Sequence, residues 1–472
     1  MSLSTLGIDA YQLTTLVAHF DAKRIAHRVT MSLFFRRLPR ARNYVVFAGL
    51  RQILDHATQL SFDAHEIDAL TKHPLLGPAL ASRPALLAAL RAIDGFEGDI
   101  DALPEGTLAF AGPAVRTDGS PLRVADAQLA IYTPLMQVKT DIVRAKLFET
   151  PWLGYINHGS MVASKAARIV DAAGGKTVLE FGARRTHPAA AIDVAYAAYL
   201  AGAYATSNLA AYARYGIPAV GTMDHFAVQA AERPGVRVDE TERDLYAAFT
   251  RAFPDAATLL VDTYDTERGL ADAVKATSGK LTGVRIDSNV SVASMQRARK
   301  ILDDLGATHV KIFVSDGLDE HKVRELAPHV AGFGVGENIS CSPDAATGVG
   351  AVAKLVVTGY GKVTMKLARG SGKATLPGAL QVHRFADHDL VALADEAAPA
   401  GGTPLMRPVW RGRKPVEGLA TLDESRAHVR RQIEALPPEL RALEPAPRPR
   451  TIVASDALVA LVERLSKEAG IA

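Results

Sequence analysis

The sequence predicts an α/β protein in which an incomplete or distorted α/β barrel is joined to a second, α+β domain built from both ends of the chain. The first observation is an alternation that begins near Thr177, where short β-type runs are separated by amphipathic helical stretches such as residues 291–306. The β-type runs cover residues 177–181, 218–223, 258–263, 282–287, 309–315 and 332–336. Alternation of this kind implies parallel strands with right-handed crossovers, and so many units favour a closed or nearly closed barrel over an open sheet.

The second observation is that this alternation is missing from both ends of the chain. Residues 1–125 mix helical and β-type segments, and after Val363 the sequence passes through loops, a hairpin-like segment at 407–418 and a last helix. We therefore expect an N-terminal α+β domain over residues 1–125, completed by residues 365–472, and a barrel domain over residues 126–364.

The composition excludes several classes of protein. The 54 basic and 51 acidic side chains leave a net charge of +3, too weak a basic field to indicate nucleic-acid binding. Cys341 is the only cysteine, which excludes an internal disulfide and a cysteine-rich zinc site. The longest apolar run, from Ala189, is interrupted by Asp193 and predicts a buried helix and no membrane span. The single cysteine fits a reducing cytoplasm, and the N-terminus lacks the basic and apolar segments of a secretory signal, so we expect a cytoplasmic protein.

Polar and small residues gather at the ends of the β-type runs, and α/β barrels carry their active sites at the C-terminal ends of the strands. Arginines hold phosphate or carboxylate through two hydrogen bonds, and glycines let backbone N–H groups approach an anion. The strand-end residues are Arg184, Arg185, His187, Thr206, Ser207, Asn208, Thr222, Asp224, His225, Arg285, Asp287, Ser315, Gly317, Gly334 and Gly336. Their convergence at one face predicts a phosphorylated or diphosphate-bearing substrate.

The same strand ends carry a family resemblance. The ordered motifs EFGARR, TSN, GTM-H, VDTYD, VRIDS, GLDE, GVG and GKATLPG resemble those of nicotinate phosphoribosyltransferases. The segments DAYQLT, FFRRLP, VFAGL and LPEGTLAF extend the resemblance, which runs from about Asp9 to the final helix. It implies a type II phosphoribosyltransferase fold, in which an incomplete α/β barrel is joined to a domain made from both chain ends.

The resemblance also implies a reaction. Nicotinate would react with 5-phosphoribosyl 1-diphosphate to give nicotinate mononucleotide and diphosphate, a step of NAD salvage. ATP hydrolysis would be coupled to this transfer through a phosphorylated histidine, as in a ligase-type enzyme, with Mg²⁺ as the required ion. We expect a homodimer with shared active sites, and no dedicated set of protein side chains that binds the metal.

Individual residues match positions of the family. His225 matches the phosphorylated histidine, and Asp287 is suited to ribose hydroxyls or to water on Mg²⁺. Tyr11, supplied by a neighbouring subunit, and Phe181 would sandwich the pyridine ring. The other residues expected to bind substrate are Arg184, Ser207, Thr222 and Arg285, and those expected at phosphate groups are Ser315, Gly317, Gly334 and Gly336.

Four of these residues have a purely structural alternative. His225 could cap a helix, and Asp287 could be the N-cap of the helix that follows its strand. Tyr11 and Phe181 could be ordinary core residues.

The chain departs from the family pattern at three positions. Val290 replaces the usual second carboxylate, Asp224 stands where a small residue is common, and Glu337 stands where threonine is usual. A glutamate facing the sugar phosphate would repel it. We therefore expect Glu337 to turn to solvent or toward a partner such as Arg369.

Other functions compete with this one. Nicotinamide phosphoribosyltransferase shares the fold but typically has an aspartate at the position of Ser207, whose neutral donors favour nicotinate. Quinolinate phosphoribosyltransferase has a much shorter chain. A non-catalytic homologue that binds pyridine or phosphoribosyl groups would fit the departures at Val290 and Glu337. A barrel hydrolase would instead use His187, Asp224 and His225 as metal ligands.

Overall fold

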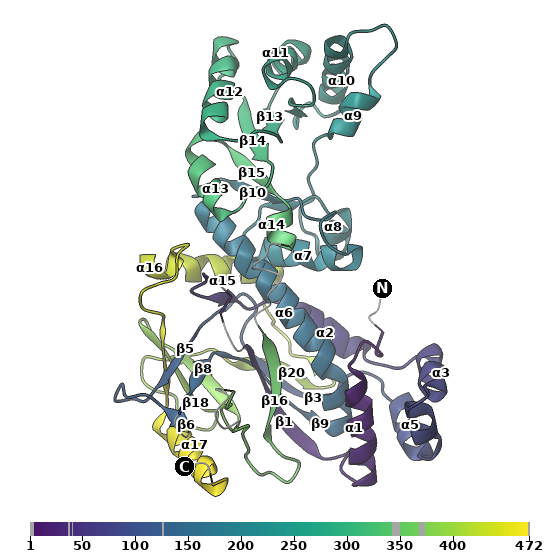
Figure 1. The fold of residues 1–472 in the computed structure, drawn as a ribbon, viewed down its shortest axis with the longest axis vertical. Helices are drawn as coiled ribbons and strands as arrows, with labels where there is room; N and C mark the ends of the chain where they lie inside the picture. Colours follow the sequence, from purple (N-terminus) through teal and green to yellow (C-terminus); the bar gives the residue numbers. More distant parts are fainter. Residues whose placement is uncertain are drawn as a thin grey trace. The chain divides into compact units, whose positions relative to one another are not determined.

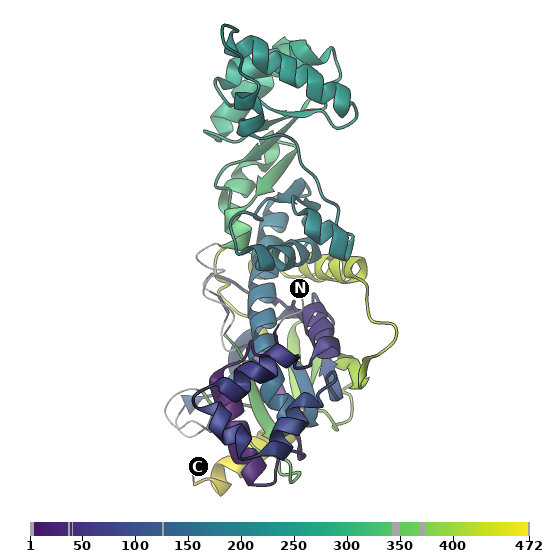
Figure 2. The same cartoon turned by 90° about the vertical axis from the view of Figure 1, so that its right-hand side faces the viewer.

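The computed structural model describes residues 4–35, 38–39, 41–124, 127–341, 350–367 and 373–470. The chain folds into two compact units (Figures 1 and 2). The first unit is formed by Met1–Met161 together with Thr347–Ala472, and the second by Val162–Ala346. These bounds differ from the expected domains 1–125 with 365–472 and 126–364, because residues 127–141 and 351–357 form strands that pair within the first unit.

The second unit contains one six-stranded parallel sheet, in the order β11-β10-β15-β14-β13-β12. Its strands are β10 Thr177–Glu180, β11 Ala205–Thr206, β12 Thr258–Leu260, β13 Gly283–Ile286, β14 Lys311–Ser315 and β15 Gly332–Val335. The strands β11 and β12 form opposite edges, so the sheet does not close between them. The prediction of an incomplete α/β barrel is therefore confirmed.

One predicted strand is wrong. Residues 218–223 contribute only an isolated parallel bridge, between Thr206 and Ala219. The carbonyl of Pro218 accepts the N–H of Thr206, and Val220 donates to the Thr206 carbonyl. A proline has no N–H with which to continue the ladder, and the chain turns into helix α9 at His225.

Helices connect the strands of the second unit. They are α6 Ile142–Ala172, which begins in the first unit, α7 Pro188–Leu200, α8 Leu209–Tyr215, α9 His225–Ala230, α10 Val238–Ala252, α11 Thr266–Thr277, α12 Val292–Asp304, α13 Glu320–Leu326, the 3₁₀ helix Ala327–His329 and α14 Glu337–Ser340. Side-chain caps at Asp265, Ser291 and Asp319 begin three of them. Val178, Val284 and Phe333 are buried core residues of the sheet.

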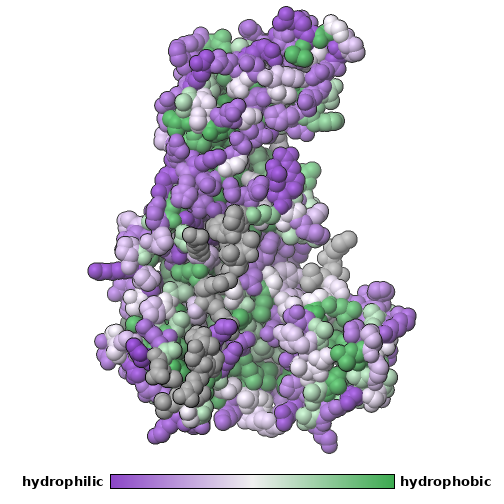
Figure 3. Space-filling view, in the orientation of Figure 1, coloured by the Kyte–Doolittle hydropathy of each residue, from purple (hydrophilic) through white to green (hydrophobic). Residues whose placement is uncertain are grey.

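The surface over α10 to α12 is mainly hydrophilic on the face shown in Figure 3. Exposed ion pairs such as Lys300 with Asp304 contribute to this character. Helix α7 covers the alanine-rich run and is largely buried, as the sequence predicts. Among the described residues, none of the helices has the length and apolar character that crossing a membrane requires.

The first unit is built from both ends of the chain, as predicted. One sheet has the order β16-β1-β9-β3-β20-β21 and another the order β19-β17-β18-β22-β5-β8. The strands are β1 Arg28–Phe35, β2 Val45–Val46, β3 Gly98–Ala102, β4 Leu108–Ala109, β5 Ala111–Val115, β6 Arg123–Val124, β7 Ala127–Gln128, β8 Ala130–Tyr132, β9 Pro134–Asp141, β16 Ala351–Val357, β17 Leu380–Arg384, β18 His388–Leu393, β19 Thr403–Pro404, β20 Arg407–Gly412, β21 Lys414–Pro415 and β22 Thr451–Ala454. The hairpin expected at 407–418 is the antiparallel pair β20–β21.

Eight helices are described in this unit besides the start of α6. They are α1 Ala10–Asp21, α2 Leu50–Gln59, α3 Ala64–Lys72, α4 Leu76–Ala81, α5 Pro84–Arg91, α15 Leu422–Glu434, α16 Pro438–Arg441 and α17 Asp456–Glu468. Helix α17 is the last helix that the sequence predicts. The buried Glu105 of the motif LPEGTLAF accepts the N–H groups of Gly49 and Leu50, so it satisfies donors at the start of α2.

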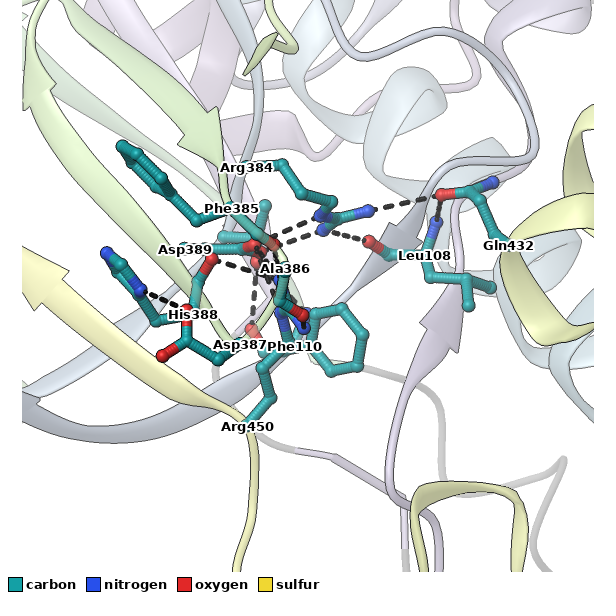
Figure 4. A network of polar contacts seen from close by, with 11 residues as sticks. Leu108, Phe110, Arg384, Phe385, Ala386, Asp387, His388, Asp389, Gln432 and Arg450 are labelled. Carbon is teal, nitrogen blue, oxygen red and sulfur yellow. Dashed lines mark hydrogen bonds and ion pairs between the residues drawn. The ribbon is translucent and has the colours of Figure 1, made fainter. Parts of the chain in front are cut away.

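A buried charge network holds the two chain ends together in the first unit (Figure 4). The carboxylate of Asp389 pairs with Arg384 at 2.8 Å and with Arg450 at 3.0 Å. Both guanidinium groups lie 5.2 Å from the ring centroid of Phe110. Arg384 also donates to the carbonyl of Leu108 at 2.7 Å. The network therefore fixes β18, and Arg450 just before β22, against β4 and Phe110.

Candidate active site

A cavity of about 660 Å³ opens at the C-terminal ends of the parallel strands. This volume is in the range of pockets that bind small molecules. All of its lining residues belong to the second unit. The predicted site residues among them are Phe181, Arg184, Ser207, Thr222, Arg285, Asp287, Ser315, Gly317, Gly334 and Gly336. The structure thus brings together residues that are more than 150 positions apart in the sequence.

The ring of Phe181 lies directly over β15. A Cβ atom at Gly334 would be 2.4 Å from two ring carbons of Phe181, so only glycine fits beneath the ring. A Cβ atom at Gly336 would be 2.9 Å from the Phe181 carbonyl oxygen. Phe181 is half-buried and lines the cavity, so it is not an ordinary core residue. These two glycines therefore set the position of an aromatic wall of the cavity.

Arg285 presents a guanidinium group with spare hydrogen-bonding capacity. Its Nη1 atom donates to Oγ1 of Thr222 at 3.1 Å. Its Nε atom is buried and has no hydrogen-bond partner within the part of the chain that the structure describes. Burial lowers the pKa of Arg285, and the nearby carboxylates of Asp287 and Asp262 oppose that shift. A buried donor without a partner is costly, so this arrangement favours a bound anion.

His225 and Asp287 face each other across the strand ends. The Nε2 atom of His225 lies 3.6 Å from Oδ2 of Asp287, and its Nδ1 atom lies 3.1 Å from Oγ1 of Thr263. The side chain is 38% exposed, so a ligand can reach it. The N-cap of α9 is Asp224, which accepts the N–H of Ala227 at 2.9 Å. The alternative that His225 is only a helix cap is therefore wrong.

Asp287 is held from both sides. Its Oδ1 atom accepts a hydrogen bond of 2.5 Å from Ser315, and its backbone N–H donates to Asp262 at 2.8 Å. Ser288 donates to the same Asp262 oxygen at 2.7 Å. The N-cap of the following helix α12 is Ser291, so the alternative role of Asp287 as that cap is also wrong. Asp287 keeps one carboxylate oxygen directed toward His225.

Three acidic residues of the family motifs support the site, and the sequence alone assigns them no role. Asp262, in VDTYD, orients the turn that carries Asp287. Glu320, in GLDE, is buried and pairs with Lys165 at 2.6 Å and Arg168 at 3.0 Å, which fixes the start of α13 after the Ser315–Gly317 turn. Glu180, in EFGARR, is buried at the end of β10. Their place within the motifs is the signal that could have identified them.

Tyr11 does not line the cavity, and Glu337 lines it although it departs from the family pattern. Tyr11 lies on α1 in the first unit and is 51% exposed, so it is not a core residue, and its expected role in a neighbour's site stays a prediction. Glu337 is the exposed first residue of α14 and lines the cavity. Its expected partner Arg369, like part of the GKATLPG motif, lies outside the described residues.

The hydrolase alternative does not fit this geometry. His187 caps α7 by accepting the N–H of Ala189 at 3.2 Å, and Asp224 caps α9. His225 is engaged with Thr263 and Asp287. Across the described residues, no group of three or more histidine, cysteine or acidic side chains could hold a metal ion. The three proposed ligands therefore do not form a metal site.

An open parallel α/β barrel with arginines, an aromatic wall and an Asp–His pair near its strand ends is the arrangement expected of an enzyme that binds a small anionic substrate. Comparisons with known proteins give a narrower assignment. The model of the nicotinate phosphoribosyltransferase family matches residues 177–372, and the model of its N-terminal domain matches residues 6–157. This chain belongs to the nicotinate phosphoribosyltransferase family.

Individual relatives agree along nearly the whole chain. A nicotinate phosphoribosyltransferase of Mycobacterium tuberculosis is 35% identical, over 98% of this chain and 94% of its own. The human nicotinate phosphoribosyltransferase is 30% identical, over 97% of this chain and 96% of its own. The crystal structure of human nicotinic acid phosphoribosyltransferase aligns with a TM-score of 0.80 at 28% identity, covering 97% of this chain and 99% of that one. The family and the fold expected from the motifs are confirmed.

Proposed function

We propose that this protein joins nicotinate to 5-phosphoribosyl 1-diphosphate, producing nicotinate mononucleotide and diphosphate as a step of NAD salvage. The observation that carries this proposal is the pairing, in one cavity, of the Phe181 ring with the guanidinium of Arg285, whose buried Nε has no partner among the described residues. A flat aromatic acid needs an aromatic surface for its ring and a fixed cation for its carboxylate. Ser207 lines the same cavity and offers a neutral side chain, which favours a carboxylate over an amide.

The reaction depends more on the positioning of the two substrates than on proton transfer. The ring nitrogen of nicotinate uses its lone pair to form a bond to C1 of the ribose, while the bond from C1 to the diphosphate oxygen breaks. Both bonding electrons leave with diphosphate, and the transition state is cation-like at C1. Arg184 would neutralise the leaving group, and Asp287 would hold the ribose hydroxyls. Ser315, Gly317, Gly334 and Gly336 line the part of the cavity proposed for phosphate groups.

His225 would couple this transfer to ATP. If Oγ1 of Thr263 accepts the Nδ1 proton, the lone pair of Nε2 is free to attack the γ-phosphorus of ATP. A nitrogen–phosphorus bond then forms as the bond to the ADP oxygen breaks. Water later cleaves the phosphohistidine and restores the neutral ring. The contact with Thr263 holds the imidazole before the attack, while Asp287, 3.6 Å from Nε2, has no proton to accept from a nitrogen whose lone pair is free.

Mg²⁺ fits this site as an ion carried by the phosphates. Magnesium prefers oxygen ligands, keeps several waters and is often held by one or two carboxylates together with substrate phosphates. The Asp287 carboxylate supplies such a ligand, and its partial exposure leaves it accessible. When bound, Mg²⁺ would offset the negative charge that develops on the leaving diphosphate.

The proposed functional unit is a homodimer in the cytoplasm. In it, Tyr11 of one subunit would complete the ring site of the other. The large exposed fraction of the Tyr11 side chain supports this, because an exposed aromatic residue is suited to an interface. Leu209 and Tyr212 on α8, which follows Ser207, are exposed apolar residues of the same kind.

A comparison of pyridine substrates tests the proposed function. The purified protein is mixed with 5-phosphoribosyl 1-diphosphate, Mg²⁺ and ATP, and separately with nicotinate, nicotinamide or quinolinate. We expect kcat/KM for nicotinate to exceed that for the other two by at least tenfold, which corresponds to about 1.4 kcal/mol. Equal or greater turnover of nicotinamide would replace the proposed activity with the amide-specific one, and no turnover of any pyridine would favour a non-catalytic homologue.

A further inference from the structure

Glu180 is a buried acid that the proposed chemistry does not use. It ends β10 and is 1% exposed. Desolvation raises the pKa of its carboxyl group, while hydrogen bonds from Thr206 and Gly182 oppose that shift. A buried carboxyl group is costly unless its oxygens accept hydrogen bonds. Here both oxygens do: Oε1 accepts the N–H of Gly182, and Oε2 accepts the hydroxyl of Thr206 at 2.6 Å.

The contact with Gly182 closes a tight turn around Phe181. A Cβ atom at position 182 would lie 1.8 Å from Oγ of Ser340 and 2.8 Å from Oε1 of Glu180. Only glycine therefore lets the backbone N–H reach the carboxyl group. The N–H of Phe181 itself donates to the carbonyl of Val335 at 2.9 Å. The backbone that carries the Phe181 ring is thus fixed on both sides.

The hydrogen bond between Glu180 and Thr206 fixes the backbone that carries Ser207. Oγ1 of Thr206 accepts the N–H of Asn208 at 3.0 Å and donates its own proton toward Glu180. The N–H of Ser207 donates to the backbone carbonyl of Glu180 at 2.9 Å. Ser207 therefore lies between Thr206, which donates a hydrogen bond to Glu180, and Asn208, which is linked to Glu180 through the Thr206 hydroxyl.

We propose that Glu180 is a positioning residue for the pyridine ring, holding Phe181 and Ser207 in a fixed relation on the walls of the cavity. The inference rests on the proposed function, which assigns these two residues to nicotinate. Glu180 does not touch the substrate. A small displacement of either wall would misplace the ring relative to C1 of the ribose, and errors of about 1 Å can cost on the order of a hundredfold in rate.

Substitutions at Thr206 test this role without replacing the buried carboxyl group. Thr206→Val keeps the shape and deletes the hydroxyl, and Thr206→Ser restores the hydroxyl. Thr250→Val is the matched control, because Thr250 is also buried in the second unit and donates to a backbone carbonyl, that of Tyr246, outside the cavity lining. Each variant is assayed for the nicotinate KM, the KM for the phosphoribosyl donor, the nicotinate to nicotinamide preference and the thermal midpoint.

We expect Thr206→Val to lower kcat/KM for nicotinate at least tenfold and to reduce the nicotinate preference, while the KM for the phosphoribosyl donor stays within twofold of wild type. Thr206→Ser and Thr250→Val should stay within about threefold on every measure. Glu180→Gln combined with Thr206→Val should be no worse than the more damaging single change, because both act on one network.

Two results would overturn the inference while leaving the proposed function intact. One is an active wild-type protein whose Thr206→Val variant keeps its kcat/KM for nicotinate. The other is a loss of kcat/KM for nicotinate in Thr206→Val that Thr250→Val also shows, because such a loss would reflect general destabilisation. A wild-type protein that forms no nicotinate mononucleotide would remove the proposed function, and this inference with it.

Discussion

The Nε2 atom of His225 lies 3.6 Å from Oδ2 of Asp287, and this pair stands at the C-terminal ends of the parallel strands. The distance is slightly longer than a hydrogen bond, and the carboxylate is already fixed by Ser315. Asp287 therefore lies beside the nitrogen that would receive the phosphoryl group without forming a hydrogen bond to it. The pair is the basis of the first prediction.

His225→Ala should abolish nicotinate-dependent ATP hydrolysis, because the nitrogen proposed to receive the phosphoryl group is gone. Slow transfer without ATP should remain, since the proposed contacts of Phe181 with the ring and of Arg285 with the carboxylate are kept. ADP release and nucleotide formation, followed in parallel, measure the two activities. His187→Ala is the control, because His187 caps α7 and should leave coupling unchanged. Acid-labile phosphate on His225→Ala at the wild-type level would contradict the role of His225.

Ser207→Asp should shift the substrate preference from nicotinate toward nicotinamide. A second carboxylate would repel that of nicotinate and would offer an acceptor to the amide of nicotinamide. The ratio of kcat/KM for the two pyridines measures the shift, and Ser207→Ala controls for loss of the hydroxyl. We expect a change of tenfold or more in the ratio for Ser207→Asp alone. An unchanged ratio would mean that the cavity distinguishes its substrates elsewhere.

Tyr11→Ala should raise the nicotinate KM, while the fold and the KM for the phosphoribosyl donor are retained. The expected reason is that an aromatic face is lost from a site shared between subunits. Kinetics together with light scattering at the assay concentration check this. Tyr360→Ala removes another exposed tyrosine of the first unit and should have no effect. Full activity of the wild-type protein as a strict monomer would rule out the shared site.

Glu337→Thr should change the KM for the phosphoribosyl donor by less than about threefold, which is under 1 kcal/mol. Glu337 is exposed, so its charge is largely screened by water. Steady-state kinetics at low and at high salt provide the measurement. Two unit charges about 4 Å apart repel by roughly 4 kcal/mol at an effective dielectric near 20. A gain in affinity of a hundredfold or more in the variant would therefore show that Glu337 faces the phosphate.

Acid should destabilise the first unit through His56. This side chain is 7% exposed and accepts a hydrogen bond of 3.0 Å from the Trp152 indole, and desolvation lowers its pKa to about 4. A histidine with a depressed folded-state pKa contributes stability above its ordinary pKa of about 6.5, and that stability is lost as the pH falls toward 4. The loss at pH 5 should be about 2 kcal/mol.

Urea unfolding at pH 7.5 and pH 5 measures this loss. The variant His56→Asn keeps an acceptor for the indole N–H and cannot be protonated, so its stability should fall less than that of the wild type between the two pH values. An equal fall in both proteins would assign the acid sensitivity to other groups.

The fold could be predicted as far as local periodicity determines it. The runs at 177–181, 258–263 and 309–315 are rich in apolar and β-branched residues, and each contains a strand of the parallel sheet. The prediction of a strand at 218–223 was wrong because Pro218 limits this segment to one bridge. The bounds of the two units follow from long-range antiparallel pairing, such as that of β1 with β16, which no local pattern reveals.

The site could be predicted where a strand ends in a polar residue. Arg285 and Asp287 lie in the cavity for this reason. The roles of Asp262 and Glu180 depend on hydrogen bonds to neighbouring strands, so they require the register that only the folded sheet supplies. The proposed role of Tyr11 requires a second subunit and could be assigned only from the family resemblance.

The central claim is that the cavity at the strand ends forms nicotinate mononucleotide. Its most direct test is to measure the nucleotide and diphosphate released from nicotinate, 5-phosphoribosyl 1-diphosphate and Mg²⁺, with and without ATP, by wild type and by Arg285→Ala. We predict equal amounts of the two products from wild type. The nicotinate KM in Arg285→Ala should rise by roughly tenfold to a hundredfold, as loss of a charge-assisted hydrogen bond of about 1.5–3 kcal/mol implies. Diphosphate release without the nucleotide, or an unchanged nicotinate KM in Arg285→Ala, would contradict the claim.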